Sequence, residues 1–384
     1  MSVRVFVQQP ALPLYRVPVF RELARRPDIN LHLVYGDDPR GPANVTPDGF
    51  VASLRPLQSL IGGRVLWHTP QLTYATRRQS DVFVLSWNSR YLSLPLALLR
   101  ARRSGVRTVL WGHGYSKNET RCGLMARRRI ARLADALLLY DRRTAQRYID
   151  FGFAADRVFV APNAIDQQPI QTARQAWLDR PEALRRFRQE KGLEEGPVLL
   201  YVSRIAPANR LDLLIEAIPS LVAKQPGLRV VLIGKAPPES LAALQRLAQR
   251  LDVHENVILP GAIYDENELA PWFLSSTAFV YPANIGLSLL HAFGYGLPVV
   301  TSDRTEAQNP EIVALQHEQN GLTYTDSNAA SLAAALDRIL SDTALRDRLA
   351  KEAHRTALHE YTLERMVDGM EAAIRSGDSA RPTR

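Results

Sequence analysis

The sequence predicts an α/β protein with two Rossmann-like domains, each built on a parallel sheet covered by helices. Short apolar runs rich in β-branched residues alternate with longer amphipathic runs along the whole chain, which is the pattern of βα units. A charged, glutamine-rich stretch without a strand, at 167–196, separates two series of such units. A chain of 384 residues has room for two domains.

The expected strands are short and apolar in both series. The first series spans residues 3–7, 31–35, 82–85, 108–111, 136–140 and 158–160. The second series spans residues 198–203, 229–233, 257–259, 278–281 and 298–301. Helices are expected between the strands. Two such sheets should face each other across a cleft, with the chemistry at the carboxyl ends of the strands.

These elements predict the domain boundaries. The N-terminal domain is expected at 1–166 and the C-terminal domain at 197–361, joined by a connection at 167–196. A final helix at 362–376 is expected to pack back toward the N-terminal domain, and residues 377–384 to form a frayed tail.

The composition limits the function classes. There are 48 Lys and Arg against 39 Asp and Glu, a net charge of +9, so anionic partners are expected. The single cysteine, Cys122, excludes an internal disulfide and zinc sites built from several thiolates. No signal peptide and no apolar run long enough for a membrane span is evident. We therefore expect a cytoplasmic protein, with peripheral association at the inner face of the cell membrane as an option.

The positive charge is concentrated in the segment from Arg121 to Arg147, which contains eight arginines. This segment could dock onto an anionic membrane surface or form a solvated helical face over the first sheet. Nucleic-acid binding is not expected, because no recognised DNA- or RNA-binding module accompanies the charge.

Several catalytic motifs are absent from the sequence. There is no P-loop, no GxGxxG after the first strand, no HExxH, no GxSxG and no paired CxxC. The loop at 8–13 lacks the glycines that a dinucleotide pyrophosphate requires, so NAD-dependent chemistry is not expected.

The most informative stretch is AFVYPANIGLSLLHAFGYGLPVVTSD, at 278–303. A strand ends at Pro282, a loop runs through Gly286, and an apolar helix is expected at 287–295. Backbone N–H groups around Ile285 and Leu287 would then form a diphosphate site at the helix N-terminus. The alternative is an ordinary strand–loop–helix in which Gly286 only permits a tight turn.

This stretch resembles the donor-site signature of the retaining GT-B glycosyltransferases of family 4. The residues that fit the pattern are Pro282, Gly286, Ala292, Gly296, Pro298 and Val299. Two acidic positions differ, because Ala283 and His291 stand where the family has Glu. The family residues contact the donor sugar and the ribose. His291 can still hydrogen-bond a ribose, whereas Ala283 makes no polar contact.

A second match, VSRIAPANRLDLLIEA at 202–217, resembles the family segment that grips the donor diphosphate. Arg204 coincides with the family Arg. Asn209 occupies the usual Lys position, and the neighbouring Arg210 could replace the lost ammonium. The alternative is that Arg204 and Arg210 are solvated charges at a helix start. Further matches include Pro310-Glu311-Ile312 and Asn320-Gly321-Leu322, so the resemblance covers most of 197–340.

The resemblance implies a GT-B fold with an N-terminal acceptor domain and a C-terminal nucleotide-sugar donor domain. It implies His113, Arg204 and Arg210 as catalytic residues. The implied donor-binding residues are Asn209, Gly234, Lys235, Gly261, Ile263, Tyr264, Asn284, Ile285, Gly286, Leu287, His291 and Glu311. The expected acceptor-binding residues, in loops that follow strands, are Tyr15, Arg16, Asn88 and Arg90.

The function implied is transfer of a sugar from a nucleoside diphosphate sugar to a glycan or lipid-linked acceptor, in surface polysaccharide or glycolipid biosynthesis. Retention of anomeric configuration is implied by the family alone. No cofactor and no metal are expected. Two alternatives remain: a GT-B protein that binds nucleotide or glycan without transfer, and a basic binding protein that is not a glycosyltransferase.

Overall fold

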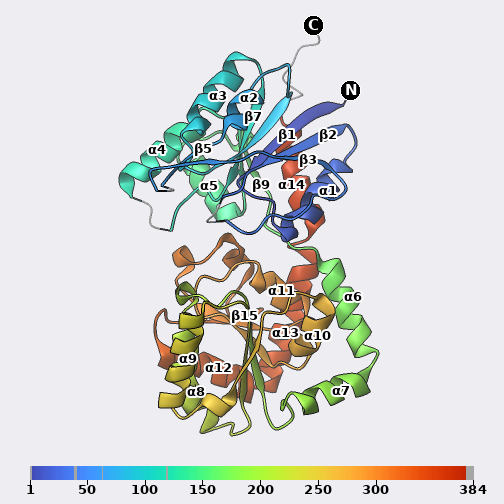
Figure 1. Ribbon diagram of the computed structural model, residues 1–384, viewed down its shortest axis with the longest axis vertical. Helices are drawn as coiled ribbons and strands as arrows, with labels where there is room; N and C mark the ends of the chain where they lie inside the picture. The colour runs from blue at the N-terminus through green and yellow to red at the C-terminus, as the bar shows by residue number, and fades with distance from the viewer. Residues whose placement is uncertain (1, 39–40, 63, 118–119, 378–384) are drawn as a thin grey trace. The chain divides into compact units, whose positions relative to one another are not determined.

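The computed structural model describes residues 2–38, 41–62, 64–117 and 120–377. The chain forms two compact units (Figure 1). Unit 1 comprises Met1–Ile165 and Leu363–Arg384, and unit 2 comprises Asp166–Thr362. Most of the tail expected at 377–384 lies outside the described residues.

Unit 1 is built on a seven-stranded parallel sheet in the order β3-β2-β1-β6-β7-β8-β9. Its strands are β1 (Val3–Gln9), β2 (Ile29–Tyr35), β3 (Val51–Leu54), β6 (Val82–Ser86), β7 (Arg107–Gly112), β8 (Ala136–Leu139) and β9 (Val158–Val160). A separate antiparallel pair joins β4 (Gln58–Leu60) to β5 (Val65–Trp67). All six strands expected in this half of the chain are present.

Helices cover both faces of this sheet. The helices of unit 1 are α1 (Val17–Ala24), α2 (Thr69–Thr73), α3 (Ser93–Arg103), α4 (Arg121–Ala131), α5 (Arg142–Asp150) and α14 (Leu363–Arg375). One apolar cluster joins α1 and α14 to the sheet, and a second joins α3 and α5 to its other face. Figure 1 shows α14, the last helix of the chain, beside α1 and β9. Met366, Val367 and Met370 are fully buried there, which explains why α14 belongs to unit 1.

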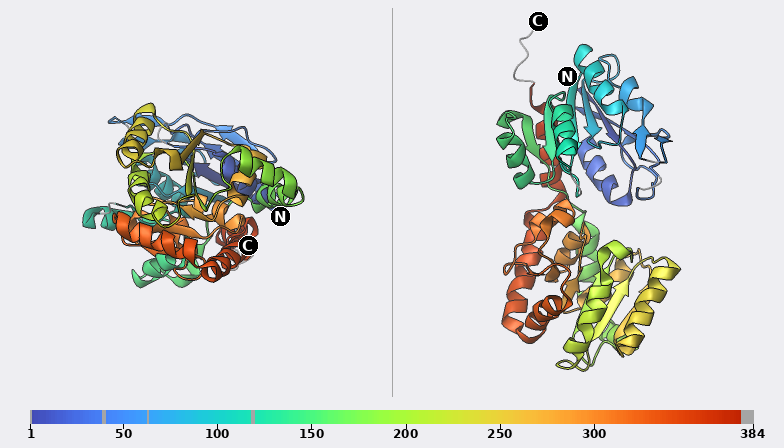
Figure 2. Two further views of the ribbon diagram at one scale, coloured as in Figure 1. Left: turned by 90° about the horizontal axis from the view of Figure 1, so that it is seen from below. Right: turned by 90° about the vertical axis from the view of Figure 1, so that its left-hand side faces the viewer.

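Unit 2 is built on a six-stranded parallel sheet in the order β12-β11-β10-β13-β14-β15. Its strands are β10 (Val198–Val202), β11 (Arg229–Ile233), β12 (Val257–Gly261), β13 (Ala278–Val280), β14 (Val299–Ser302) and β15 (Gly321–Tyr324). Its helices are α6 (Gln167–Leu178), α7 (Pro181–Glu190), α8 (Leu211–Val222), α9 (Pro238–Arg250), α10 (Glu266–Leu274), α11 (Ser288–Gly294), α12 (Ala329–Ser341) and α13 (Thr343–His359). Helices α8, α9 and α12 lie on one side of the sheet, and α10, α11 and α13 on the other (Figures 1 and 2).

The stretch at 167–196 differs from the interdomain connection with some helix that we expected, because its helices, α6 and α7, belong to unit 2. Ile170 and Ala173 of α6 are buried. The Gln167 side chain donates to the Leu290 carbonyl at 3.1 Å, and that of Gln171 to the Gly294 carbonyl at 2.7 Å. The glutamines that suggested a linker are therefore the residues that fasten α6 to α11.

Four strands were missed, and their composition explains why. β3 and β4 are largely exposed, β5 has three residues, and β15 begins at Gly321. None of them presents the continuous apolar run that marks a buried parallel strand.

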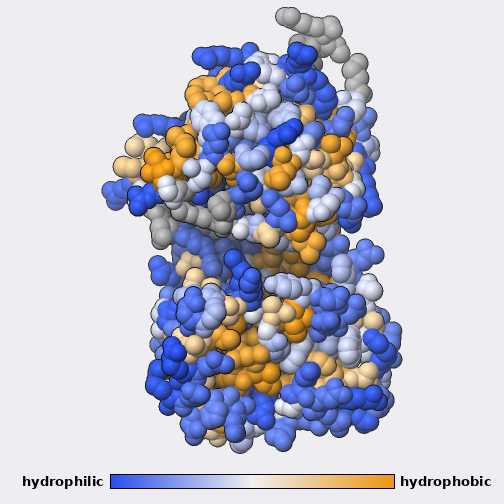
Figure 3. Space-filling view, in the orientation of Figure 1, coloured by the Kyte–Doolittle hydropathy of each residue, from blue (hydrophilic) through white to orange (hydrophobic). Residues whose placement is uncertain are grey.

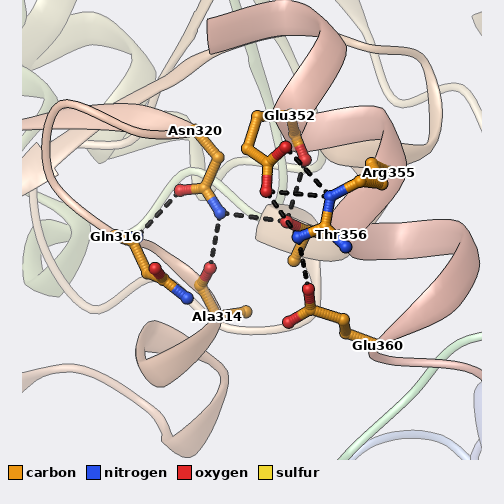
Figure 4. Close-up of polar contacts among 7 residues, drawn as sticks. All are labelled: Ala314, Gln316, Asn320, Glu352, Arg355, Thr356 and Glu360. Carbon is orange, nitrogen blue, oxygen red and sulfur yellow. Dashed lines mark hydrogen bonds and ion pairs between the residues drawn. The ribbon is translucent and has the colours of Figure 1, made fainter.

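Asn320 has a structural role that the sequence pattern did not reveal (Figure 4). Its amide donates to the Ala314 carbonyl at 2.9 Å and to the Thr356 hydroxyl at 3.2 Å, and its oxygen accepts from the Gln316 N–H at 2.8 Å. On the same helix, α13, Arg355 pairs with Glu352 and Glu360. These hydrogen bonds satisfy the buried amide of Asn320 and join the loop before β15 to α13.

None of the described helices is long and apolar enough to cross a membrane.

Candidate functional site

Each sheet has a point at which the strand order reverses. In unit 1 this point lies between β1 and β6, and in unit 2 between β10 and β13. Ligands of doubly wound sheets bind outside the carboxyl ends of the strands at such a point. The residues predicted for the two binding sites follow these strands or their neighbours in each unit.

Arg204 and Lys235 are two exposed cations in unit 2. Arg204 follows β10 and Lys235 follows β11, which are adjacent parallel strands. The Ile205 N–H donates to the Lys235 carbonyl at 2.9 Å, which joins the two loops. Within the described residues, neither side chain takes part in a hydrogen bond or an ion pair. Both charges are therefore available to an anionic ligand.

Gly234, beside Lys235, permits a very close approach of the two loops. A Cβ atom on Gly234 would lie 1.7 Å from the Ser203 carbonyl oxygen, which is far inside van der Waals contact. The Gly234 N–H also donates to the Gly261 carbonyl at 2.8 Å. Gly234 therefore serves the backbone geometry of the site and offers no side chain to a donor.

Asn209, at the family Lys position, is buried and supports the loop that we expected to bind the donor. Its amide donates to the Tyr201 hydroxyl and to the Arg204 carbonyl, both at 2.7 Å, and its oxygen accepts from Asn284 at 3.1 Å. The Ala283 N–H donates to the Asn209 carbonyl at 3.2 Å. Asn209 therefore fixes the loop after β13 against the loop after β10, and its own polar atoms are occupied.

Arg210 differs from its expected role as a substitute phosphate ligand. Its guanidinium binds both carboxylate oxygens of Asp212, at 2.9–3.1 Å, and lies 3.3 Å from the Ser327 hydroxyl. These contacts with Asp212 raise the pKa of Arg210 further above its usual value. Because Asp212 already neutralises this charge, Arg204 rather than Arg210 is the arginine available to a diphosphate.

The donor loop also differs from the expected set of free N–H groups. The Ile285 N–H is buried and donates to the Gln308 side chain at 2.7 Å, so it is not available to a phosphate. Asn284 adopts the left-handed conformation, with φ of 65°, and its carbonyl accepts from Asn309 at 3.0 Å. Helix α11 begins at Ser288, after Gly286 and Leu287, and has seven residues. The loop is thus held by its own polar neighbours.

His291 lies on α11 with a carboxylate partner. Its Nε2 is 2.8 Å from Glu266 Oε1, which also accepts from the Tyr295 hydroxyl at 2.6 Å. Burial raises the pKa of Glu266, but the hydrogen bonds from His291 and Tyr295 outweigh it and hold the pKa below its usual value. A carboxylate, that of Glu266 of α10, therefore lies beside His291.

The remaining predicted donor residues lie at neighbouring strand ends of unit 2. Gly261 is the last residue of β12, and Ile263 and Tyr264 follow it; the Tyr264 side chain is 81% exposed, which leaves its ring open to stacking. Glu311 is buried, and a Cβ on Gly286 would lie 3.7 Å from its carboxylate.

Unit 1 contains a cavity of about 440 Å³ at its own switch point. All four predicted acceptor residues, together with His113, line this cavity: Tyr15, Arg16, Asn88 and Arg90. The sequence did not predict that Trp87, Trp111 and Arg127 also line it. Arg127 belongs to the arginine-rich segment for which membrane docking and a solvated helical face were the two alternatives, yet its own side chain is buried.

His113 follows β7 and lies 5.1 Å from the Tyr140 ring, centre to centre. Desolvation in the cavity lowers the pKa of His113, and the cations Arg16, Lys117 and Arg127 lower it further. The residue is nevertheless exposed to solvent, which weakens this shift. His113 is thus neutral at pH 7, with one nitrogen able to accept a hydrogen bond.

A buried polar network lies at the carboxyl ends of β1 and β6, next to residues that line the cavity. The Gln8 oxygen accepts from Gln71 at 2.9 Å and from the Ser86 N–H at 3.3 Å. The Gln8 amide lies 3.1 Å from His68 Nδ1, while His68 Nε2 lies 3.0 Å from the Arg55 carbonyl. Burial lowers the pKa of His68 to about 4, so the ring is neutral and accepts at Nδ1. The network holds the carboxyl ends of β1 and β6 in fixed register.

Among the described residues, no group of three or more His, Cys, Asp or Glu side chains could hold a metal ion.

Comparison with known families identifies the chain. The family model "Glycosyltransferase Family 4" matches residues 19–168, and the model "Glycosyl transferases group 1" matches residues 184–356. The chain is a GT-B glycosyltransferase similar to family 4. The two matches fall in unit 1 and unit 2 respectively, apart from the last few residues of the first.

Curated relatives and solved structures agree with this assignment. A GDP-mannose-dependent alpha-(1-6)-phosphatidylinositol monomannoside mannosyltransferase of Mycolicibacterium smegmatis is 29% identical over 65% of this chain and 65% of its own length. The lipopolysaccharide core biosynthesis glycosyltransferase LpsE of Rhizobium meliloti is 26% identical over 72% of this chain and 78% of its own. The structure of Anabaena Alr3699/HepE in complex with UDP shares the fold, with a TM-score of 0.72 and 16% identity over 98% of this chain and 100% of its own.

The chain spans just under two thirds of the length of the Mycolicibacterium smegmatis relative.

Some residues of the candidate sites were not predicted, although their positions in the sequence gave an indication. Trp111 and Tyr140 stand at the ends of expected strands, where ligand contacts concentrate. Glu266, Gln308 and Asp212 carried no such signal, because they act through contacts with residues distant in sequence or with a side chain two positions away.

Proposed function

We propose that this glycosyltransferase moves a sugar from a nucleoside diphosphate sugar to a glycan or lipid-linked acceptor, without a metal and with retention of configuration. The observation that carries the donor assignment is the pair of exposed cations, Arg204 and Lys235, on joined loops at the carboxyl ends of β10 and β11. Positive charge at this position suits a departing diphosphate.

The proposed chemistry follows from that charge. The bond between the sugar anomeric carbon and the diphosphate oxygen breaks, and a bond to the acceptor oxygen forms. The acceptor proton passes to the departing phosphate. Ala283 offers no nucleophile on the donor loop, which favours front-face attack by the acceptor over a covalent intermediate on that residue.

The names of the relatives support the substrate classes. One relative is named as GDP-mannose-dependent and as acting on a phosphatidylinositol monomannoside, and one as acting in lipopolysaccharide core biosynthesis. A structural neighbour was solved with UDP and glucose. We therefore propose a role in surface polysaccharide or glycolipid biosynthesis at the cytoplasmic side of the membrane.

The first test is the melting temperature of the full-length protein against UDP, GDP, dTDP, ADP, CMP and NAD. A ligand at about 100 times its Kd adds roughly 2.7 kcal/mol of stability, so one nucleoside diphosphate is expected to raise the melting temperature clearly. NAD serves as the control, since the chain lacks a dinucleotide loop. No shift with any nucleoside diphosphate would contradict the donor site.

A second candidate function is nucleotide or glycan binding without transfer. It is favoured by the commitment of Arg210 to Asp212 and by Ala283 at the family Glu position. The two functions differ in turnover: a transferase releases the nucleoside diphosphate from its sugar in the presence of acceptor, while a binding protein gives only the thermal shift.

We also propose that unit 1 docks on an anionic membrane. Leu92, at the N-cap of α3, and Leu96 and Leu99 within the helix are exposed and share one face, and Met125 is exposed on α4. Figure 3 shows apolar surface over both helices among hydrophilic residues. The arginines that accompany them at the surface include Arg103, Arg121, Arg129 and Arg142. Apolar side chains beside cations suit a lipid surface that carries negative charge.

This docking predicts selective vesicle binding. Full-length protein is expected to sediment with vesicles that contain phosphatidylglycerol and not with phosphatidylcholine alone. Replacing Arg121, Arg129 and Arg142 by Gln should weaken binding roughly 100-fold, at about 1 kcal/mol per basic residue. Replacing the exposed Lys224, Arg246 and Arg250 of unit 2 by Gln is the matched control. Equal loss in both variants, or equal binding to neutral vesicles, would contradict the proposal.

A further inference from the structure

Arg16 is a buried cation in an aromatic surround. It ends the short 3-10 turn at Leu14–Arg16 after β1, and it is 7% exposed. Its guanidinium carbon lies 5.0 Å from the Trp111 ring centre, 5.4 Å from that of Tyr15 and 5.7 Å from that of Tyr140. Aromatic faces attract a cation at these distances, and they fix its position without neutralising its charge.

The polar contacts of Arg16 are with neutral groups. Its Nη2 donates to the Tyr140 hydroxyl at 3.2 Å, and its Nη1 lies 3.7 Å from the Met366 sulfur. In the part of the chain that the structure describes, no Asp or Glu pairs with Arg16. A guanidinium stays protonated at all relevant pH values, and a buried charge without a counter-ion is costly. An anionic ligand would supply the missing counter-ion.

The cavity into which Arg16 faces is itself cationic. Its described lining residues include Arg16, Arg90 and Arg127 and contain no Asp or Glu. Arg90 lies 3.3 Å from Asp38, which is not among the lining residues. Three guanidinium groups therefore line the cavity, which suits an anionic ligand.

Neutral polar groups stand beside these cations. Asn88, Ser89 and Ser116 line the same cavity, and the Asn88 oxygen accepts from the Arg90 N–H at 3.0 Å. Amide and hydroxyl groups of this kind recognise the hydroxyls of a sugar or polyol.

We infer that the acceptor of this glycosyltransferase carries a phosphate group, as a monoester or diester, which binds the guanidinium of Arg16 in the unit 1 cavity. The inference rests on the proposed function and names the acceptor class. A planar guanidinium matches two phosphate oxygens, and a phosphate monoester carries nearly two negative charges.

Calorimetric titration of the full-length protein tests the inference. The phosphate probes are glucose 6-phosphate, myo-inositol 1-phosphate, glycerophosphoinositol and a short-chain phosphatidylinositol. The comparison probes are glucose, myo-inositol and glucuronic acid. At least one phosphate probe is expected to bind about tenfold or more tightly than its dephosphorylated counterpart, which is the size of one charged hydrogen bond.

Variants assign the effect to Arg16. Arg16→Gln should weaken binding of that probe about tenfold or more. Arg16→Lys should weaken it less, because the lysine ammonium keeps the positive charge but cannot donate two parallel hydrogen bonds as a guanidinium does. Arg78→Gln removes an exposed arginine of unit 1 outside the cavity and should change nothing. Arg204→Gln should lose nucleotide affinity while keeping the phosphate preference. If Arg16→Gln does not fold, the affinity of Arg16→Lys for the phosphate probe, compared with that of the wild type, tests the role of Arg16.

The outcomes also separate the sources of the phosphate. Preference for a monoester would identify a soluble phosphorylated sugar or polyol, and preference for the diester probes would identify a lipid headgroup. Equal binding of the neutral probes or of glucuronic acid, or an unchanged preference in the Arg16 variants, would overturn the inference. Since no probe contains a nucleotide, a failure of the donor panel would contradict the proposed function without deciding this test.

Discussion

Replacing Arg204 by Gln is expected to reduce kcat/KM for sugar transfer by about 100- to 1000-fold, which corresponds to the loss of about 3–4 kcal/mol of transition-state stabilisation. The reason is that the Arg204 guanidinium is exposed and makes no ion pair with the described residues, whereas that of Arg210 is held by Asp212. The measurement is initial-rate kinetics with the nucleotide sugar that the thermal panel identifies.

The control for this variant is Arg246→Gln on α9, which removes an exposed arginine of the same unit that pairs with no described residue. It should retain wild-type kinetics. Both proteins should melt within a few degrees of the wild type, because neither side chain contributes to the packing of unit 2. Unchanged kcat/KM in Arg204→Gln would remove the proposed diphosphate site.

Replacing Gly234 by Ala is expected to destabilise unit 2 so strongly that the protein is recovered in low yield or without cooperative unfolding. The added Cβ would stand 1.7 Å from the Ser203 carbonyl oxygen, and this atom belongs to the backbone at the end of β10. Relief would require the loops after β10 and β11 to separate. Effects above about 4 kcal/mol arise from such steric conflicts at special backbone positions. Thermal and urea unfolding measure the loss.

Gly192→Ala provides the comparison. Gly192 has φ of 64°, and nothing lies within 4 Å of an added Cβ, so this variant meets only the conformational penalty. That penalty is about 1 kcal/mol. If Gly192→Ala and Gly234→Ala lowered the free energy of unfolding equally, the close approach at Gly234 would not be a determinant of the fold.

The predicted strands show how far a sequence pattern reaches. All eleven expected strands are present, with ends displaced by a few residues at most. Nine of them are largely buried parallel strands, whose apolar run on both faces is visible in the sequence, while β9 and β12 lie at sheet edges and have no fully buried residue. The missed strands are exposed, very short or begin with glycine, and their pairing depends on a neighbour that the pattern does not show.

The candidate site was predicted unevenly for a similar reason. The residues around the unit 1 cavity were expected one loop at a time, and parallel strands bring their carboxyl ends to one edge. The roles of Arg210 and Ile285 were not foreseen, because Asp212 and Gln308 occupy them through side-chain geometry. Motif position alone therefore identified the loop proposed to bind the donor and did not identify which of its groups are available.

The sequence by itself determined the α/β class, the two series of strands, the family resemblance and the loops in which ligand contacts are predicted, because apolar periodicity and motif spacing are local properties of the chain. Only the tertiary structure decided which charges are neutralised. It paired Arg210 with Asp212 and His291 with Glu266, and it enclosed Arg16 among aromatic rings without an acid among the described residues. The physical reason is that the pairing of a charge depends on side chains from other elements of the fold, whose approach is set by packing and leaves no periodic trace in the sequence.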